Sequence, residues 1–354
     1  MRTAFTLLAL LAATTSGHTQ WTLQTSNTTA DLRGIHNVGN GVAWASGTNG
    51  TILRTEDSGY VWQSCSIPPG AEKLDFRGIQ AFDANTAIVM SSGTGNLSRL
   101  YKTTDGCHSW KLIFTNPDTD GFFDAVSAQI PDEFLILGDP VDGQFSHFIS
   151  TNGGTDWSKT HDPLGLRSDK DEGAFAASNS ALLVIDPSQK TSIFGSGGPS
   201  GARIFLECVP CDSRGFFARP IPFPKGQSAG VFSIANRDAN RLIAVGGDYL
   251  KPDEPTGTAA CSYDGGKTWS PATTPPHGYR SSVAYDPTTK TWITVGPNGT
   301  DISTDDGKNW RALHPDPALH ESPDADRSWN ALSLPFVVGP HGRIGKLEDA
   351  ALKH

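Results

Sequence analysis

A turn motif that recurs five times constrains the fold of this chain more than any other feature of its sequence. Four copies fit the pattern Ser/Thr-x-Asp/Asn-x-Gly-x-x-Trp, and a fifth differs only by placing Cys107 at the glycine position. Similarity that returns at a regular spacing is typical of repeat architectures. The acidic or amide residue and the tryptophan of the five copies are Asp57 and Trp62, Asp105 and Trp110, Asn152 and Trp157, Asp264 and Trp269, and Asp305 and Trp310.

The spacing of these tryptophans indicates how many units lie between them. They are separated by 48, 47, 112 and 41 residues, so the longest interval fits two units with a degenerate copy of the turn at residues 208–211. In each copy we expect the Asp or Asn side chain to accept backbone hydrogen bonds, the glycine to take a positive φ and the tryptophan to anchor a hairpin. One carboxylate per turn cannot hold a cation alone, so we interpret the turns as structural staples and expect no metal site.

Upstream of each turn, an apolar strand is followed by a second strand that usually ends in glycine. This pattern predicts seven units, with strand pairs at residues 32–35 and 42–47, 76–79 and 87–90, 123–126 and 134–138, 174–177 and 191–195, 231–234 and 242–246, 279–283 and 292–296, and 329–332 and 336–339. The last unit lacks a fourth strand, which the N-terminal segment 21–24 can supply. With 38 Gly and 24 Pro, the chain is predicted to be all-β, a seven-bladed β-propeller of four-stranded antiparallel sheets closed by the N-terminal strand.

Residues 1–17 are predicted to be a signal peptide, because the positive charge of Arg2 precedes a short apolar run that is followed by small residues. Residues 18–354 are then expected to form a single propeller domain, periplasmic or secreted. No later segment approaches the ~20 apolar residues of a transmembrane helix. The net charge of −9 argues against nucleic acid or an anionic membrane as the main partner, and we expect a monomer.

The five cysteines allow two disulfides in an oxidising compartment and leave one thiol over. Cys208 and Cys211 follow a predicted strand instead of opening a helix, so a structural disulfide between them is favoured over a redox site or half of a zinc site. Cys65 and Cys107 occupy comparable places in neighbouring repeats. The pairing of Cys65, Cys107 and Cys261 stays open at this point.

The five turns resemble Asp-box (BNR) repeats, and the chain is similar to the photosystem II stability/assembly factor family of β-propellers and its exported relatives in non-photosynthetic bacteria. The resemblance covers nearly all of residues 18–354. It implies a propeller that serves as a docking platform for a protein partner. Asp-box propellers also include sialidases and other glycoside hydrolases, in which the boxes lie away from the active site, so the resemblance is more specific for fold than for function.

Propeller topology predicts which loops share a face. The loops that lead into the innermost strands and the loops between second and third strands emerge together, opposite the staple turns. The first set supplies Arg33, Arg77, Asp124, Glu172, Arg280 and Asn330, and the second supplies Asp139, Asp142, Arg203, Asp248, Tyr249 and His341. Charged side chains at the mouth of a central channel favour a ligand site for a polypeptide or a glycan, although Arg–Asp pairs between blades can also serve only to lock the ring.

A carbohydrate-active hydrolase is the alternative interpretation of this face. A sialidase would use Arg33, Arg77 and Arg280 for a substrate carboxylate, with Tyr279, Glu172 and Asp139 as the catalytic groups. Another glycosidase would need two carboxylates that flank a sugar. Pairs among Asp124, Asp139, Asp142, Glu172 and Asp248 supply that residue type.

The glycine-rich run at residues 195–201 is followed by a predicted strand and not by a helix. We therefore interpret it as a loop and not as a dinucleotide site, and we expect no cofactor. A redox role would rest only on the names given to similar secreted proteins. The leading prediction is an exported binding or assembly module that works through the channel mouth.

Overall fold

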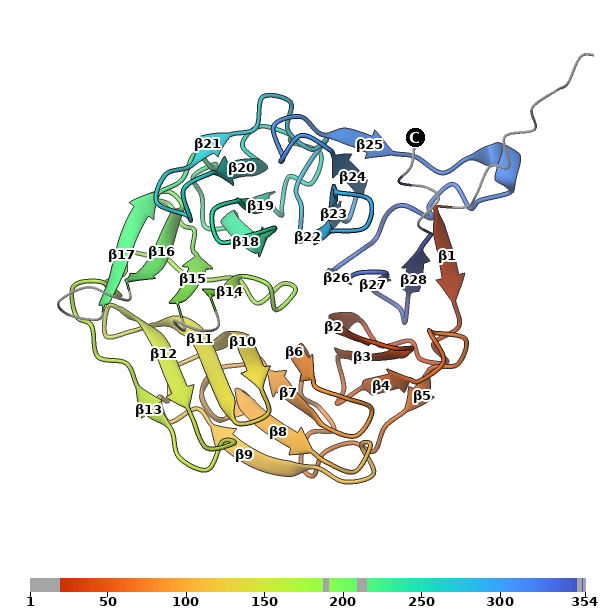
Figure 1. Ribbon diagram of the computed structural model, residues 1–354. Coiled ribbons are helices and arrows are strands. Elements are labelled where there is room, and N and C mark those ends of the chain that lie inside the picture. The colour runs from red at the N-terminus through yellow and green to blue at the C-terminus, as the bar shows by residue number, and fades with distance from the viewer. Residues whose placement is uncertain (1–19, 187–190, 209–214, 349–351, 353–354) are drawn as a thin grey trace, which may run out of the picture.

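The computed structural model describes residues 20–186, 191–208, 215–348 and 352. Seven four-stranded antiparallel sheets stand as blades around a central axis, which confirms the predicted fold (Figure 1). Two short 3-10 turns, η1 (Gly95–Leu97) and η2 (Pro317–Leu319), lie between strands. Within the described ranges, no helix has the length and apolar character that crossing a membrane requires. The predicted signal peptide lies outside the described residues.

The first three blades follow one another along the chain. Blade 1 comprises β2 (Leu32–Gly39), β3 (Val42–Gly47), β4 (Ile52–Thr55) and β5 (Gln63–Ser64). Blade 2 comprises β6 (Phe76–Ala81), β7 (Ala87–Ser91), β8 (Arg99–Thr103) and β9 (Lys111–Thr115). Blade 3 comprises β10 (Phe123–Ile130), β11 (Glu133–Val141), β12 (Gln144–Ser150) and β13 (Ser158–Lys159).

The remaining four blades complete the ring. Blade 4 comprises β14 (Leu182–Asp186), β15 (Thr191–Gly195), β16 (Arg203–Cys208) and β17 (Gly215–Pro220). Blade 5 comprises β18 (Ala229–Asn236), β19 (Leu242–Asp248), β20 (Ala259–Ser262) and β21 (Ser270–Pro271). Blade 6 comprises β22 (Ser282–Asp286), β23 (Thr291–Gly296), β24 (Gly299–Ser303) and β25 (Arg311–Leu313). Blade 7 comprises β26 (Ala331–Ser333), β27 (Phe336–Val338), β28 (Ile344–Leu347) and β1 (Trp21–Gln24).

The ring closes as predicted, with the N-terminal strand as the outermost strand of the last blade. β1 pairs antiparallel with β28, and the register places Trp21 opposite Leu347. The indole N–H of Trp62 in blade 1 donates to Gln24 Oε1 at 2.8 Å, so the closing strand is also tied to the first blade. Closure leaves both end blades with neighbours, which protects their exposed edges.

The hydrophobic core is divided among the interfaces between neighbouring blades. Trp44 of blade 1 and Phe76 of blade 2 are both 0% exposed and belong to one cluster. Comparable clusters of described residues fill the other six interfaces, including one between blades 6 and 7 that contains Trp21 and Trp329. Each blade is therefore stabilised mainly by apolar surface that it buries against its two neighbours.

The five staple turns, at residues 55–62, 103–110, 150–157, 262–269 and 303–310, share one hydrogen-bond pattern. Asp264 Oδ1 accepts from the Thr268 N–H at 2.9 Å, and Ser262 Oγ donates to the same carboxylate at 2.9 Å. The Ser262 hydroxyl also accepts from the Gly266 N–H at 2.8 Å. The equivalent bonds recur in the other four turns. The Ser or Thr and the Asp or Asn side chains of the motif are thus engaged within their own turns.

A disulfide joins Cys65, just after β5 of blade 1, to Cys107 in the staple turn of blade 2. Cys107 has a φ of 66° at the position where the other four turns carry glycine. An L-residue is disfavoured in this left-handed region, and the covalent link to blade 1 accounts for its presence there. The predicted Cys208–Cys211 disulfide falls outside the described residues, because Cys211 is not among them.

One predicted strand is wrong. Residues 174–177 were expected to form the innermost strand of blade 4, but that strand is β14, which starts at Leu182. The segment 173–181 instead leaves the blade and runs toward the centre of the ring, beside β14 in Figure 1. Between its two ends, the segment forms hydrogen bonds with blades 2, 3, 5 and 6, which explains why a pattern suited to a strand does not pair there. Gly173 and Ala181, at its ends, bond to blade 4. We call residues 173–181 the channel plug.

Candidate functional site

The channel plug crosses the middle of the ring and is held from several sides. Asn179 Oδ1 accepts from the Val126 N–H of blade 3 at 2.8 Å, and its Nδ2 donates to the Val126 carbonyl at 3.0 Å. Ser178 Oγ donates to the Ser281 carbonyl, next to blade 6, at 2.7 Å. Ser180 Oγ donates to Ser233 Oγ of blade 5 at 2.7 Å. The plug therefore ties together inner strands that are far apart in the sequence.

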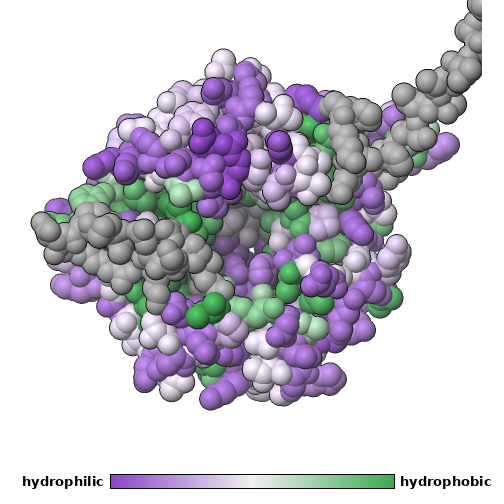
Figure 2. Space-filling model, in the orientation of Figure 1, coloured by the Kyte–Doolittle hydropathy of each residue, from purple (hydrophilic) through white to green (hydrophobic). Residues whose placement is uncertain are grey.

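Opposite the staple turns, the mouth of the channel contains a cavity of about 440 Å³. We call this side of the ring the mouth face, and the side with the staple turns the staple face. Figure 2 shows the ring in space-filling form from the same side as Figure 1, hollowed at its centre and with many hydrophilic residues around its rim. The cavity is lined by Arg33, Arg77, Phe122, Asp124, Asp139, residues 174–177, Phe232, Tyr249 and Tyr279. The plug thus forms part of the cavity wall.

Aromatic rings form a continuous wall on one side of this cavity. Phe175 of the plug stacks on Phe232 of β18 with ring centroids 4.0 Å apart. Tyr279 meets Phe232 edge to face at 4.8 Å, and Tyr249 does so at 6.1 Å. Tyr249 is 47% exposed and stands at the rim. Such a wall can pack against an apolar or ring-bearing ligand group.

Two arginines contribute positive charge to the cavity. Arg77 is engaged, because its Nε donates to Asp75 at 2.7 Å and its Nη1 donates to the Ala176 carbonyl of the plug at 3.2 Å. Arg33 has no hydrogen bond or ion pair with any of the described residues, and its buried Nε is unpartnered. A guanidinium without a partner is suited to pair with an anionic ligand group.

Two carboxyl groups line the same cavity. Asp139 Oδ1 accepts from the Ala174 N–H of the plug at 3.0 Å. Burial raises the pKa of Asp139 to about 6, against the opposing effect of this hydrogen bond. Asp124 is 1% exposed and its Oδ2 has no hydrogen-bond partner. Burial, and next the negative charge of Asp139, raise the pKa of Asp124 well above its usual range. Its surroundings therefore favour the neutral form of the Asp124 carboxyl group.

A second cavity of about 620 Å³ adjoins the first and shares Asp139, Ala174 and Phe175 with it. Its lining is acidic, with Asp120, Asp169, Asp171 and Glu172. Glu172 is not free to act, because Arg203 forms an ion pair with it and donates from Nε at 2.9 Å. Glu172 and Arg203, both predicted for the mouth face, thus join blade 4 to the segment before the plug.

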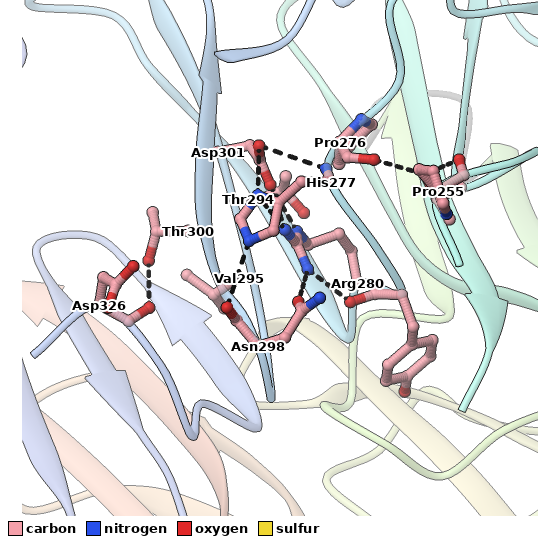
Figure 3. A network of polar contacts seen from close by, with 12 residues as sticks. Pro255, Pro276, His277, Arg280, Thr294, Val295, Asn298, Thr300, Asp301 and Asp326 are labelled. Carbon is pink, nitrogen blue, oxygen red and sulfur yellow. Dashed lines mark hydrogen bonds and ion pairs between the residues drawn. The ribbon is translucent and has the colours of Figure 1, made fainter. Parts of the chain in front are cut away.

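The structure places Arg280 away from the cavity, contrary to the sequence-based expectation. Arg280 is 0% exposed, and its Nε donates to Asp301 Oδ2 at 2.8 Å (Figure 3). His277 Nδ1 lies 2.9 Å from the other oxygen of Asp301. Burial alone would raise the pKa of Asp301, but His277 and Arg280 lower it. Because Arg280 is locked in this network, the three arginines predicted for a sialidase do not meet.

The other predicted mouth-face residues lie outside the first cavity. Asp248 accepts from Ser228 Oγ at 2.6 Å and from the Leu250 N–H at 3.1 Å. Asn330 Nδ2 donates to the Leu32 carbonyl at 2.8 Å, which links blades 7 and 1. Asp142 is an exposed turn residue, and the side chain of His341 is 88% exposed.

Sequence reasoning missed the aromatic side of the site. Phe122, Phe175 and Phe232 line the cavity but were not among the predicted ligand-binding residues. Phe122 and Phe232 lie beside the start of an inner strand, so the topology that selected the arginines could also have selected them. Phe175 is likewise the second residue of the predicted inner strand 174–177, so the same topology could have selected it, although that segment forms the plug. Among the described residues, no group of three or more His, Cys, Asp or Glu side chains could hold a metal ion.

No protein-family model matches the sequence, and no curated protein matches it. YCF48 bound to D1 peptide matches the fold with a TM-score of 0.64 and 16% identity, over 94% of this chain and 97% of that one. YCF48 from Cyanidioschyzon merolae gives 0.62 and 17%, over 93% and 99%. An ancestral GH74 enzyme gives 0.53 and 14%, over 84% of this chain but 40% of its own. At these identities the likeness establishes the fold, and the chain is a seven-bladed β-propeller similar in structure to YCF48.

Proposed function

We propose that this chain is an exported binding module that recognises a segment of polypeptide through its mouth face. The observation that carries the proposal is the cavity at the channel mouth. It combines an unpartnered cation, Arg33, with an aromatic wall of Phe175, Phe232 and Tyr279. A concave site with a few polar groups and much apolar surface is the usual form of a binding site.

The channel plug favours binding of a ligand at the channel mouth and disfavours its passage through the ring. Its hydrogen bonds to Val126, Ser233 and Ser281 span the channel, so a ligand that enters from the mouth face meets the plug. A segment of chain would therefore lie across the mouth and place side chains in the cavity. Preorganised walls reduce the entropy that such binding must overcome.

The comparison with YCF48 supports the same choice by analogy. That propeller, which has 16% identity to this chain, has been solved bound to D1 peptide. The analogy is one of fold, so the identity of the polypeptide for this chain is not transferred. The cavity residues of this chain carry the argument.

Export is part of the proposal. It is supported by the N-terminal sequence, in which Arg2 precedes a short apolar run. It is also supported by the disulfide between Cys65 and Cys107, because such bonds persist mainly in oxidising compartments. Mass spectrometry of the mature N-terminus tests it: cleavage near residue 17 is expected, and an intact Met1 on the cell-retained protein would contradict it.

Selection from a phage-displayed library of random peptides tests the binding proposal. Tyr249→Ala at the rim should reduce the affinity of the selected peptides at least about tenfold, because aromatic anchors dominate such interfaces. Tyr60→Ala is the matched control, since Tyr60 is 86% exposed and lies in a staple turn. An equal loss of affinity in both variants would mean that the peptides bind elsewhere. The same would follow if the affinity of the selected peptides did not change in Tyr249→Ala.

A carbohydrate-active hydrolase is a second candidate, favoured by one observation. Asp139 lines both cavities and has a pKa of about 6, which suits a general acid near neutral pH. An aryl-glycoside screen tests it, with Asp139→Asn expected to abolish any turnover. Absence of turnover by the wild type across the screen would remove this candidate.

A further inference from the structure

The carboxyl pair at the channel mouth has surroundings unlike those of the staple turns. Asp124 is buried with an unpartnered Oδ2, and Asp139 lies between the two cavities with one hydrogen bond, from the plug. The negative charge of Asp139 raises the pKa of Asp124. Neighbouring buried carboxyl groups resist double ionisation, so the pair holds a proton that its surroundings control.

We propose that the cavity takes up a proton when it binds an anionic group of a polypeptide, with Arg33 pairing the ligand carboxylate and the Asp124–Asp139 pair holding the proton. This inference rests on the proposed function, because it assumes that the mouth face binds polypeptide. To polypeptide binding it adds two properties: the recognised group is anionic, and its affinity depends on pH.

Other charged and titratable groups surround the carboxyl pair. Arg77 is already ion-paired with Asp75. Burial raises the pKa of Tyr279, which stays neutral. In the described part of the chain, no histidine lines either cavity. The remaining groups are Arg33, Tyr249, Asp248 with Lys251, Glu172 with Arg203, and Asp120, Asp169 and Asp171 in the second cavity.

The sign of the effect follows from the pKa of Asp139, which is about 6 in the free protein. A bound ligand displaces water from the cavity and brings a negative charge, and both changes raise that pKa further. Above pH 6 the free carboxylate is ionised, so binding must bring in a proton and affinity falls as pH rises. The fall approaches about tenfold per pH unit when one proton is taken up. Below about pH 5 the site is already protonated and the dependence disappears.

Asparagine at position 139 imitates the protonated form. Its side-chain oxygen can still accept from the Ala174 N–H, so the contact with the plug is kept. It carries no charge and takes up no proton. Asp142→Asn is the matched control, because Asp142 is exposed in the turn that follows β11 and lines neither cavity.

Isothermal titration calorimetry with N-acetyl-L-phenylalanine, whose carboxylate and ring match Arg33 and the aromatic wall, tests the inference. Titrations at about pH 6.0 and 7.5, in phosphate and in imidazole buffer, give affinity and proton uptake together. The wild type and Asp142→Asn should bind about 10- to 30-fold more weakly at the higher pH and take up close to one proton there. Asp139→Asn should show equal affinity at both pH values and no uptake. The neutral amide of the ligand should bind weakly throughout.

Each other result counts against the inference. A wild-type affinity that does not change with pH overturns it, as does proton uptake that persists in Asp139→Asn or the absence of binding at any pH. The proposed function is judged separately, because peptides selected from the library can still depend on Tyr249 when the pH dependence is absent. Far-ultraviolet circular dichroism of Asp139→Asn shows whether the propeller remains folded.

Discussion

The two faces of this propeller use the same residue, aspartate, in opposite environments. On the staple face, hydrogen bonds from Ser109 and then Thr103 lower the pKa of Asp105 to about 2. On the mouth face, burial raises the pKa of Asp139 to about 6, and Asp124 lacks a partner for one oxygen. Carboxylates that accept hydrogen bonds within their own turn stabilise the fold. Carboxyl groups that lack such partners lower the stability of the folded protein and are typical of functional sites.

The largest expected effect comes from a staple-face tryptophan that should affect stability and not binding. Trp310 is 5% exposed in a staple turn, and Trp310→Ala should lower the free energy of unfolding by about 3–5 kcal/mol without changing the peptide affinity of the folded protein. Tyr249→Ala should lower it by less than about 0.5 kcal/mol and weaken peptide binding. Urea denaturation and peptide binding measured on both variants check this. Weakened binding by folded Trp310→Ala would break the distinction between the faces.

The disulfide gives the next largest effect, on the staple face. It closes a loop of 42 residues, so Cys65→Ser with Cys107→Ser should cost about 2–4 kcal/mol. Cys65→Ser with Cys107→Gly should recover about 1 kcal/mol, because glycine tolerates the positive φ of position 107. Thermal unfolding of the two double variants measures the difference. Equal stability would mean that the backbone relaxes once the disulfide is lost.

The faces should also respond oppositely to pH. The raised pKa of Asp139 means that its ionisation destabilises the folded state above pH 6, and this penalty vanishes as pH falls below about 4. Asp139→Asn should therefore raise the free energy of unfolding at pH 7.5 by about 3 kcal/mol. The lowered pKa of Asp105 gives stability above about pH 4 that is lost toward pH 2. Urea denaturation of the wild type, Asp139→Asn and Asp105→Asn between pH 2 and 8 checks both signs.

The smallest effect concerns a single staple. Asp264→Ala removes the acceptor of the Thr268 N–H and the partner of the Ser262 hydroxyl, and should lower the free energy of unfolding by about 1–2 kcal/mol. Asp124→Asn should cost less, because the amide has nearly the same size as the neutral carboxyl group and, like it, leaves one polar atom without a partner. Chemical denaturation at pH 7.5 compares them. A greater loss in Asp124→Asn would show that Asp124 has a structural role.

The sequence predicted the repeated part of the fold well, because each repeat is specified by nearby residues. The staple-turn pattern around Asp264 and Trp269 and the lone strand at Trp21 sufficed for seven blades and their closure. Topology alone also placed Arg33, Arg77, Asp124 and Asp139 around one cavity. These features follow from the order of strands within each blade, which the repeats supply.

The part that could not be predicted depends on contacts between distant residues. The plug is held by Asn179 against Val126 and by Ser178 against Ser281, and no local pattern signals such bonds. The disulfide partner of Cys65 depends likewise on how two blades meet. Arg280 was misplaced because topology gives the position of its backbone, whereas its pairing with Asp301 decides where the side chain points.

Measurement of individual carboxyl pKa values by carbon-detected NMR tests the contrast between the faces most directly. We predict that Asp139 titrates near pH 6 and Asp105 near pH 2, while Asp124 stays protonated beyond the usual range of an aspartate. If all three titrate together near about pH 4, as aspartates in water do, then the mouth-face carboxyl groups are ordinary surface acids and the account is wrong.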